Sequence, residues 1–236
     1  MAKKLFFCDS HRFVIKGETI ARTGLWVAKK CYALLKIYDL ETNKDISKIV
    51  TKGLGTVRSS FPEAFAKFMS TVLENILKNF AKTDIDNEIL SFYNNLSNIN
   101  YSTISKNTSV KDLSKYDDGG TSMLKFKKGA PAQVKAALIY NRFLISKNLD
   151  KRYALIRSGD KIKWCFLRKN PYLLDRMAFK GYDDPKEVLS LVENYIDYNE
   201  MFNRELFNKL SSFYSAMGWG IVPTKLNQNS SKLFSF

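Results

Sequence analysis

Polar and apolar residues alternate between Lys29 and Tyr38, which predicts a β-strand. One face of this strand is apolar and consists of Cys31, Ala33, Leu35 and Ile37. The opposite face carries Lys30, Tyr32, Lys36 and Tyr38, with Leu34 among them. Lysine can neutralise phosphate, and tyrosine offers a flat ring and a hydroxyl to sugars and phosphates. The pattern therefore fits a surface for a polyanion, and it also fits an ordinary solvated face.

Shorter apolar pieces predict further β-structure. In the first fifth of the chain they are Leu5–Cys8, Phe13–Lys16 and Ile49–Lys52, with a turn near Glu41–Asp45. Much later, the turn signal Ser158-Gly159-Asp160 predicts a β-hairpin between Tyr153–Ile156 and Ile162–Leu167. The polar stretch Asn94–Thr108 and the glycine- and aspartate-rich segment Tyr116–Thr121 are predicted loops.

Apolar residues recur at helical spacing in the remaining segments, and we predict that these stripes face a core. The longest stripe is Phe61, Phe65, Phe68, Met69, Val72, Ile76 and Phe80. Two later stripes are Val188, Leu191, Val192 and Tyr195, and Phe202, Leu206, Leu210, Phe213 and Met217. Another helix begins near Pro131. The predicted fold class is α+β, with short antiparallel strands at the N-terminus followed by a mainly α-helical part with a small β-hairpin subdomain.

The charge balance points to an anionic partner. The 236 residues include 38 Lys+Arg and 23 Asp+Glu, which gives a formal charge of +15, and such an excess concerns partners and not fold. The positive charge is concentrated in residues 1–60 (+7) and 101–180 (+12), whereas residues 61–100 and 181–236 carry −2 each. Three cysteines and one histidine fit a reducing compartment. Because no signal peptide or membrane span is evident, we expect a soluble, cytoplasmic protein.

The segment between the early strands and the long helix is a candidate phosphate site. Ser60 and Glu63 match a capping box, and Pro62 suits a first helical turn. Since a helix N-terminus presents free N–H groups, Arg58, Ser59 and Ser60 could cradle a phosphate there. The alternative is a plain helix cap, which needs only Ser60.

The helix that begins near Pro131 carries a second candidate. Lys135 and Arg142 lie seven residues apart and hence on one side, with Asn141 beside them. Further lysines and an arginine flank this helix at Lys125, Lys127, Lys128, Lys147, Lys151 and Arg152. A basic stripe on an otherwise apolar helix could contact a nucleic-acid backbone, and it could equally be a solvated face.

Two candidates for catalysis or metal binding are weak. Asp117-Asp118 follows an aromatic residue, but the flanks predict a loop and not the apolar strands that a two-metal site requires. His11 near Asp9 lacks an oxyanion framework. We therefore predict no catalytic residue, no metal ligand and no cofactor in this chain.

Taken in order, these segments resemble the C-terminal part of a family B DNA polymerase of the kind carried by large tailed phages. Lys30-Cys31-Tyr32 resembles the Lys-x-Tyr motif of the palm, which touches the DNA minor groove near the primer end. Lys52-Gly53 through Pro62 resembles the passage from palm to thumb, and Lys115–Gly120 with Lys135–Arg142 resembles a thumb loop and helix. Gly159–Trp164 and Leu167–Pro171 resemble the small β-subdomain of the thumb. The position between Lys30 and Tyr32 is often arginine in the family and is Cys31 here.

The resemblance implies residues 1–54 as the last palm strands and 55–236 as the thumb. It implies DNA contacts by Lys29, Lys30, Tyr32, Lys52, Arg58, Ser59, Ser60, Lys135, Asn141 and Arg142. It also implies that the tail, at about 227–236, binds a sliding clamp through Leu233, Phe234 and Phe236.

The family's catalytic aspartates, with their Asp-Thr-Asp motif, do not occur in this chain. The resemblance therefore implies one subunit of a split polymerase that grips primer–template DNA. A second chain would supply the exonuclease, the fingers, the catalytic palm and the Mg²⁺ site. The alternative is a non-catalytic DNA-binding or processivity module derived from a polymerase thumb.

Overall fold

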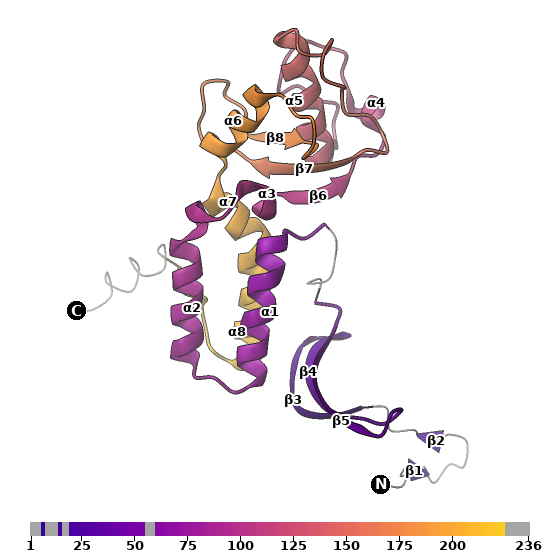
Figure 1. Cartoon of the computed structure of the whole chain (residues 1–236), viewed down its shortest axis with the longest axis vertical. Coiled ribbons are helices and arrows are strands. Elements are labelled where there is room, and N and C mark those ends of the chain that lie inside the picture. Colours follow the sequence, from indigo (N-terminus) through magenta and orange to yellow (C-terminus); the bar gives the residue numbers. More distant parts are fainter. Residues whose placement is uncertain (1–5, 8–13, 16–18, 55–59, 225–236) are drawn as a thin grey trace, which may run out of the picture.

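The computed structural model describes residues 6–7, 14–15, 19–54 and 60–224, and it has the predicted α+β class. A three-stranded sheet near the N-terminus lies beside a group of helices, and a second three-stranded sheet with its own helices lies at the far end of that group (Figure 1). A short pair of strands, β1 (Phe6–Phe7) and β2 (Val14–Ile15), precedes the first sheet.

The first sheet is antiparallel, with the order β3 (Thr19–Ala28), β4 (Cys31–Asp39) and β5 (Lys44–Lys52). The predicted strand β4 is present, but it begins at Cys31. Lys29 and Lys30 instead form the two-residue turn between β3 and β4, where Lys30 has a φ of 64°, a left-handed conformation that occurs in turns. The prediction that Lys30 shares a strand face with Tyr32 is therefore wrong.

The group of helices contains α1 (Glu63–Leu77), α2 (Lys82–Asn94) and the C-terminal helices. The latter run through α7 (Tyr198–Phe202), a π-helical turn (Asn203–Phe207) and α8 (Asn208–Met217). The predicted stripe on α1 is buried from Phe65 to Ile76, whereas Phe80 lies beyond the helix end and is exposed. Asn75 donates to Glu88 at 2.8 Å and joins α1 to α2. Thr23 donates to the carbonyl of Leu77 at 2.5 Å and joins β3 to α1.

The second sheet has the order β6 (Lys106–Ser109), β7 (Lys161–Phe166) and β8 (Arg176–Phe179). Helix α5 (Ala132–Ser146) packs against β8 and β7, and α6 (Lys186–Tyr195) packs against β8. Three short helices complete the fold, namely η1 (Leu96–Asn98), α3 (Tyr101–Ile104) and α4 (Leu113–Tyr116). The predicted loop 94–108 therefore contains η1, α3 and part of a strand.

The predicted hairpin around Gly159 is wrong in its pairing. The N–H of Gly159 donates to the carbonyl of Val110, and the N–H of Val110 donates to the carbonyl of Asp160. The turn therefore extends the pairing of β7 with β6. Residues 153–156 form no strand, because the side chain of Asn141 bonds both backbone groups of Ile156.

Candidate nucleic-acid interface

An aromatic and cationic row crosses one face of the first sheet. In the strand register Trp26 is paired with Tyr32, and Tyr32 is paired with Lys52. Directly paired residues in antiparallel strands have their side chains on the same face. Four residues farther along β4, Lys36 is paired with Lys48 on this face. We call Trp26, Tyr32, Lys48 and Lys52 the sheet platform.

The opposite face of the same sheet packs inward, as the alternation of β4 predicts. Leu25 and Ala33, which are paired with each other, are buried in the core. Leu35 and its partner Ile49 pack against that core. This packing directs the platform side chains to the opposite, open face, where Trp26, Lys48 and Lys52 are exposed and Tyr32 is half-buried.

Trp26 is fixed by the residue beside it. Gly24 lies on the same face two residues earlier, and a Cβ atom placed there would be 2.5 Å from Cη2 of the Trp26 indole. The same Cβ would be 2.8 Å from a methyl carbon of Leu34. The six-membered ring of Trp26 therefore occupies the space that a side chain at position 24 would fill. Trp26 was not among the site residues predicted from the sequence. The feature that could have indicated it is a tryptophan two residues after a glycine and close to Lys29 and Lys30.

The charges around the platform have one sign. Lys29 and Lys30 are exposed in the turn next to Trp26. The acidic residues of β4, β5 and their connection are Asp39, Glu41 and Asp45, all at the other end of the sheet. Lys36 is bound to Asp39 at 3.2 Å, so the exposed lysines near Trp26 are the ones available to an anion.

The predicted phosphate cradle at the start of α1 is only partly described. The N-cap residue is Pro62, and no side chain caps the helix. The predicted capping box between Ser60 and Glu63 is therefore wrong. Ser60 is half-buried, and Arg58 and Ser59 lie outside the described residues.

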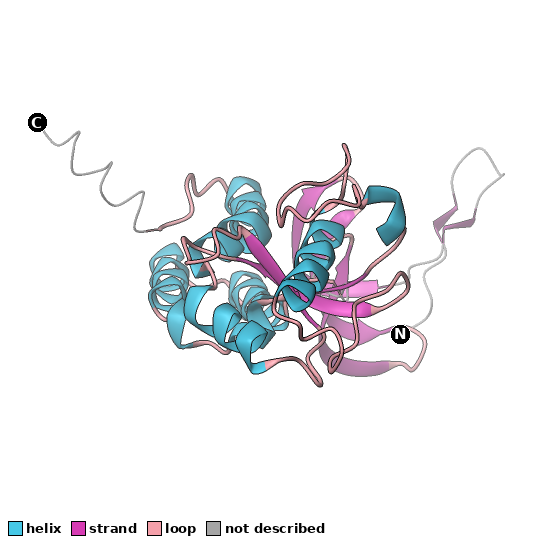
Figure 2. Cartoon of the chain, turned by 90° about the horizontal axis from the view of Figure 1, so that it is seen from above, coloured by secondary structure: helices cyan, strands magenta, loops and turns pink. Residues whose placement is uncertain are grey.

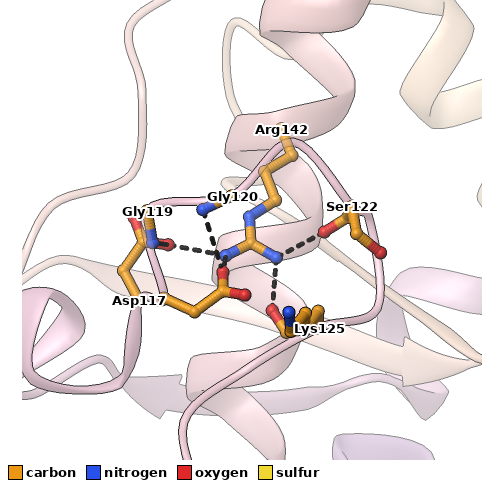
Figure 3. A network of polar contacts seen from close by, with 7 residues as sticks. Asp117, Gly119, Gly120, Ser122, Lys125 and Arg142 are labelled. Atoms are coloured by element: carbon orange, nitrogen blue, oxygen red, sulfur yellow. Dashed lines mark hydrogen bonds and ion pairs between the residues drawn. The ribbon is translucent and has the colours of Figure 1, made fainter.

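Arg142 is buried at the centre of a polar network (Figure 3). Its Nη1 donates to the carbonyls of Ser122 and Lys125, both at 2.6 Å. Its Nη2 donates to the carboxylates of Asp117 at 2.6 Å and Asp118 at 2.8 Å. The predicted exposed stripe of Lys135 and Arg142 is therefore wrong for Arg142, because its guanidinium is occupied within the chain.

Asn141 is also engaged within the chain. Its amide nitrogen donates to the carbonyl of Ile156, and its amide oxygen accepts from the N–H of Ile156, both at 2.8 Å. These two bonds argue against the predicted DNA contact through this side chain. Lys135 is half-buried with its ammonium 5.9 Å from the centre of the Phe126 ring, and its contact with DNA stays a prediction.

The network of Arg142 fixes a basic loop, which we define as residues 111–128. Five lysines of this loop, namely Lys111, Lys115, Lys125, Lys127 and Lys128, are exposed. The N–H of Lys127 donates to the carbonyl of Tyr116 at 3.0 Å, and the N–H of Leu113 donates to Ser158 at 2.9 Å. Arg142 thus has a role that the sequence did not reveal, since it holds the segment that presents these lysines.

Asp117 and Asp118 form ion pairs with Arg142 and do not face one another across a metal site. Burial alone would raise the pKa of Asp117. The pKa is nevertheless below its ordinary value, because the carboxylate accepts hydrogen bonds from Arg142 and the Gly119 N–H and lies beside the positive charge of Arg142. Among the described residues, no group of three or more His, Cys, Asp or Glu side chains could hold a metal ion. The predicted clamp-binding residues Leu233, Phe234 and Phe236 lie outside the described part of the chain.

Seen from above, most of the helices lie on one side, and the strands lie toward the other side together with further helices (Figure 2). The sheet platform lies on strands, whereas the basic loop includes helix α4, which carries Lys115. In the part of the chain that the structure describes, none of the helices has the length and apolar composition needed to cross a membrane.

Comparison with known proteins shows that this chain is similar to phage DNA polymerases. The chain is 27% identical over 198 residues to the DNA-directed DNA polymerase of Enterobacteria phage T4, across 83% of this chain and 21% of that protein. It is 26% identical over 220 residues to the DNA-directed DNA polymerase of Escherichia phage RB69, across 90% of this chain and 23% of that protein. No protein-family profile matches the chain. The predicted resemblance to phage family B polymerases is confirmed, and the chain spans about a fifth of the length of these relatives.

Proposed function

We propose that this chain is the DNA-gripping part of a DNA-directed DNA polymerase and holds primer–template DNA. The observation that carries the proposal is the sheet platform, where exposed lysines and aromatic rings share one open face. Lysines that neutralise phosphates supply most of the affinity for DNA and release counterions when they bind. The similarity to two phage polymerases makes DNA the preferred polyanion.

Two regions would share the grip. The platform, with Lys29 and Lys30 in its turn, would contact the backbone near the primer end. The basic loop would contact the backbone farther along, because its five lysines are exposed on a segment that Arg142 holds in place. Lys135, beside this loop, would add a further contact.

The proposed division of labour places the chemistry on another chain. That chain would supply the exonuclease, the fingers and the catalytic aspartates with their Mg²⁺, in the cytoplasm of an infected cell. Nucleotide transfer needs carboxylates that hold two metal ions in line with the reacting phosphate. In the proposed arrangement, residues 1–54 would complete the palm, 55–236 would form the thumb, and the tail with Leu233, Phe234 and Phe236 would bind a sliding clamp.

A primer-extension assay tests this division. The full chain is incubated with Mg²⁺, deoxynucleotides and a 5′-labelled primer–template, either alone or with a co-expressed chain that carries an Asp-Thr-Asp palm motif. The proposal expects no extension by either chain alone and extension by the pair. Extension by this chain alone would overturn the assignment of the catalytic aspartates to a partner. DNA binding without any stable complex with such a chain would favour the non-catalytic processivity module.

A further inference from the structure

Trp26 is a large aromatic side chain left open on a cationic surface. Its side chain is 66% exposed, whereas Trp164 is buried at 3% and Trp219 is half-buried. Leaving so much apolar surface in water is unfavourable, so an exposed tryptophan rimmed by polar residues indicates a binding surface. The residues that the structure describes leave the ring of Trp26 largely uncovered, and the residues paired with Trp26 and Tyr32 lie in the same sheet.

The indole is also held in one position. It lies over Gly24, where there is no side chain to displace it, and a methyl carbon of Leu34 borders the same space. A ring that is already fixed loses little conformational freedom when a ligand stacks on it. Tyr32 is beside it in the cross-strand row, and Lys52 follows Tyr32. The row therefore joins a fixed flat surface to a cation that can take a phosphate.

The surrounding charge decides what the ligand is. The exposed charged groups near Trp26 are Lys29, Lys30 and Lys52, and the carboxylates of the sheet lie at its other end. A polyanion with flat rings matches both features, whereas an apolar protein surface would match the ring alone. Bases inside a duplex are covered on both faces and a terminal pair is covered on one face, so an unpaired base is the part of DNA that offers the most free ring surface.

We propose that Trp26 is a stacking residue for an unpaired nucleobase of DNA, with Lys52 binding the adjoining phosphate. This inference rests on the proposed function, because it assumes that DNA lies on the platform. It adds that the platform distinguishes a DNA end with unpaired bases from a blunt duplex. The phosphate contacts are independent of base, so the distinction comes from the ring.

Three fluorescein-labelled DNA probes test the inference with the full chain. The first is a duplex with a three-nucleotide single-stranded overhang, the second has the same overhang with abasic sugars, and the third is blunt. The overhang with bases and the abasic overhang carry the same phosphates, so their ratio of dissociation constants isolates stacking. Wild type is expected to bind the overhang with bases roughly 5- to 100-fold more tightly than the abasic one, the range that stacking of one base gives.

Two substitutions at the same position separate stacking from bulk. Trp26→Leu keeps an apolar side chain over Gly24 but removes the aromatic ring, and it is expected to bring the ratio to about 1. Trp26→Phe keeps a smaller ring and is expected to retain part of the ratio. Lys186→Ala, at the start of α6, is the control that should leave all three affinities unchanged. If Trp26→Leu does not fold, as judged by circular dichroism, the ratio for wild type and for Trp26→Phe still tests the inference.

The results distinguish a failure of the proposed function from a failure of the stacking role of Trp26. If none of the three probes binds, the proposed function fails. If all three bind with equal affinity and the same salt dependence, the proposed function stands and the stacking role of Trp26 is wrong. A wild-type ratio near 1, together with a partner chain that binds wild type and not Trp26→Leu, would assign the exposed ring to a protein interface instead.

Discussion

Replacement of Arg142 by methionine is expected to destabilise the protein by about 3 kcal/mol. The guanidinium is 8% exposed and makes four hydrogen bonds, two of them to carboxylates. Methionine retains much of the apolar stem but leaves Asp118, which is 16% exposed, without its cation. Removing one partner of a buried ion pair costs about 3–5 kcal/mol. Asp117 is 43% exposed, so solvent screens its ion pair with Arg142 and this pair adds little to stability. The expected loss of stability is therefore at the lower end of that range.

Urea unfolding at pH 7 measures this loss, and limited trypsin digestion reports on the basic loop. Without Arg142, the carbonyls of Ser122 and Lys125 lose their donors, so cleavage after Lys125, Lys127 and Lys128 is expected to become faster. Arg157→Met, at an exposed arginine, is the matched control and should change neither readout. In a double-mutant cycle, Asp118→Asn should cost less in the Arg142→Met background than in wild type. A loss below about 1 kcal/mol with unchanged digestion would show that the network does not hold the loop.

Three further predictions concern single residues. The pKa of Asp117 is lowered in the folded protein. The contribution of this carboxylate to stability is therefore present above the unfolded pKa of about 3.9 and is lost as the pH falls through the folded pKa. Urea midpoints measured from pH 6 to 3 should show this loss in wild type and less of it in Asp117→Asn. Lys52→Ala should reduce the slope of log affinity for DNA against log salt by about one unit, and Lys186→Ala should not; equal slopes would remove Lys52 from the phosphate contacts. Gly24→Ala should displace the Trp26 ring with a small loss of stability, since the new Cβ would lie 2.5 Å from it; an unchanged near-ultraviolet circular dichroism spectrum would refute the close packing.

Local patterns were sufficient for several of the elements. The stripe from Phe65 to Ile76 predicted α1, and the alternation after Cys31 predicted β4, because each pattern follows from the geometry of a single segment. Strand β3 was not predicted, because Gly24 and register shifts near Ala21 and Val27 interrupt its alternation. Such irregularities are set by the neighbouring strand and leave a weak signal in the sequence.

Contacts between distant segments could not be predicted in the same way. The turn at Gly159 was recognised, but its pairing with Val110 depends on a strand about fifty residues earlier. Arg142 has helical spacing from Lys135 and therefore fits a basic stripe equally well, and only the positions of Asp117 and Asp118 show that it is buried. Burial of a charged residue depends on where its partners lie, which periodicity does not contain.

A salt titration of DNA binding shows whether this chain holds DNA through its phosphate backbone. The full chain is titrated into a fluorescein-labelled primer–template duplex, and anisotropy is measured between 50 and 200 mM salt. If the platform and the basic loop hold the phosphate backbone, binding is saturable and the slope of log affinity against log salt is about −4 or steeper, since each neutralised phosphate contributes about −0.9. Absence of saturable binding at 50 mM salt, or a slope near zero, would contradict the account.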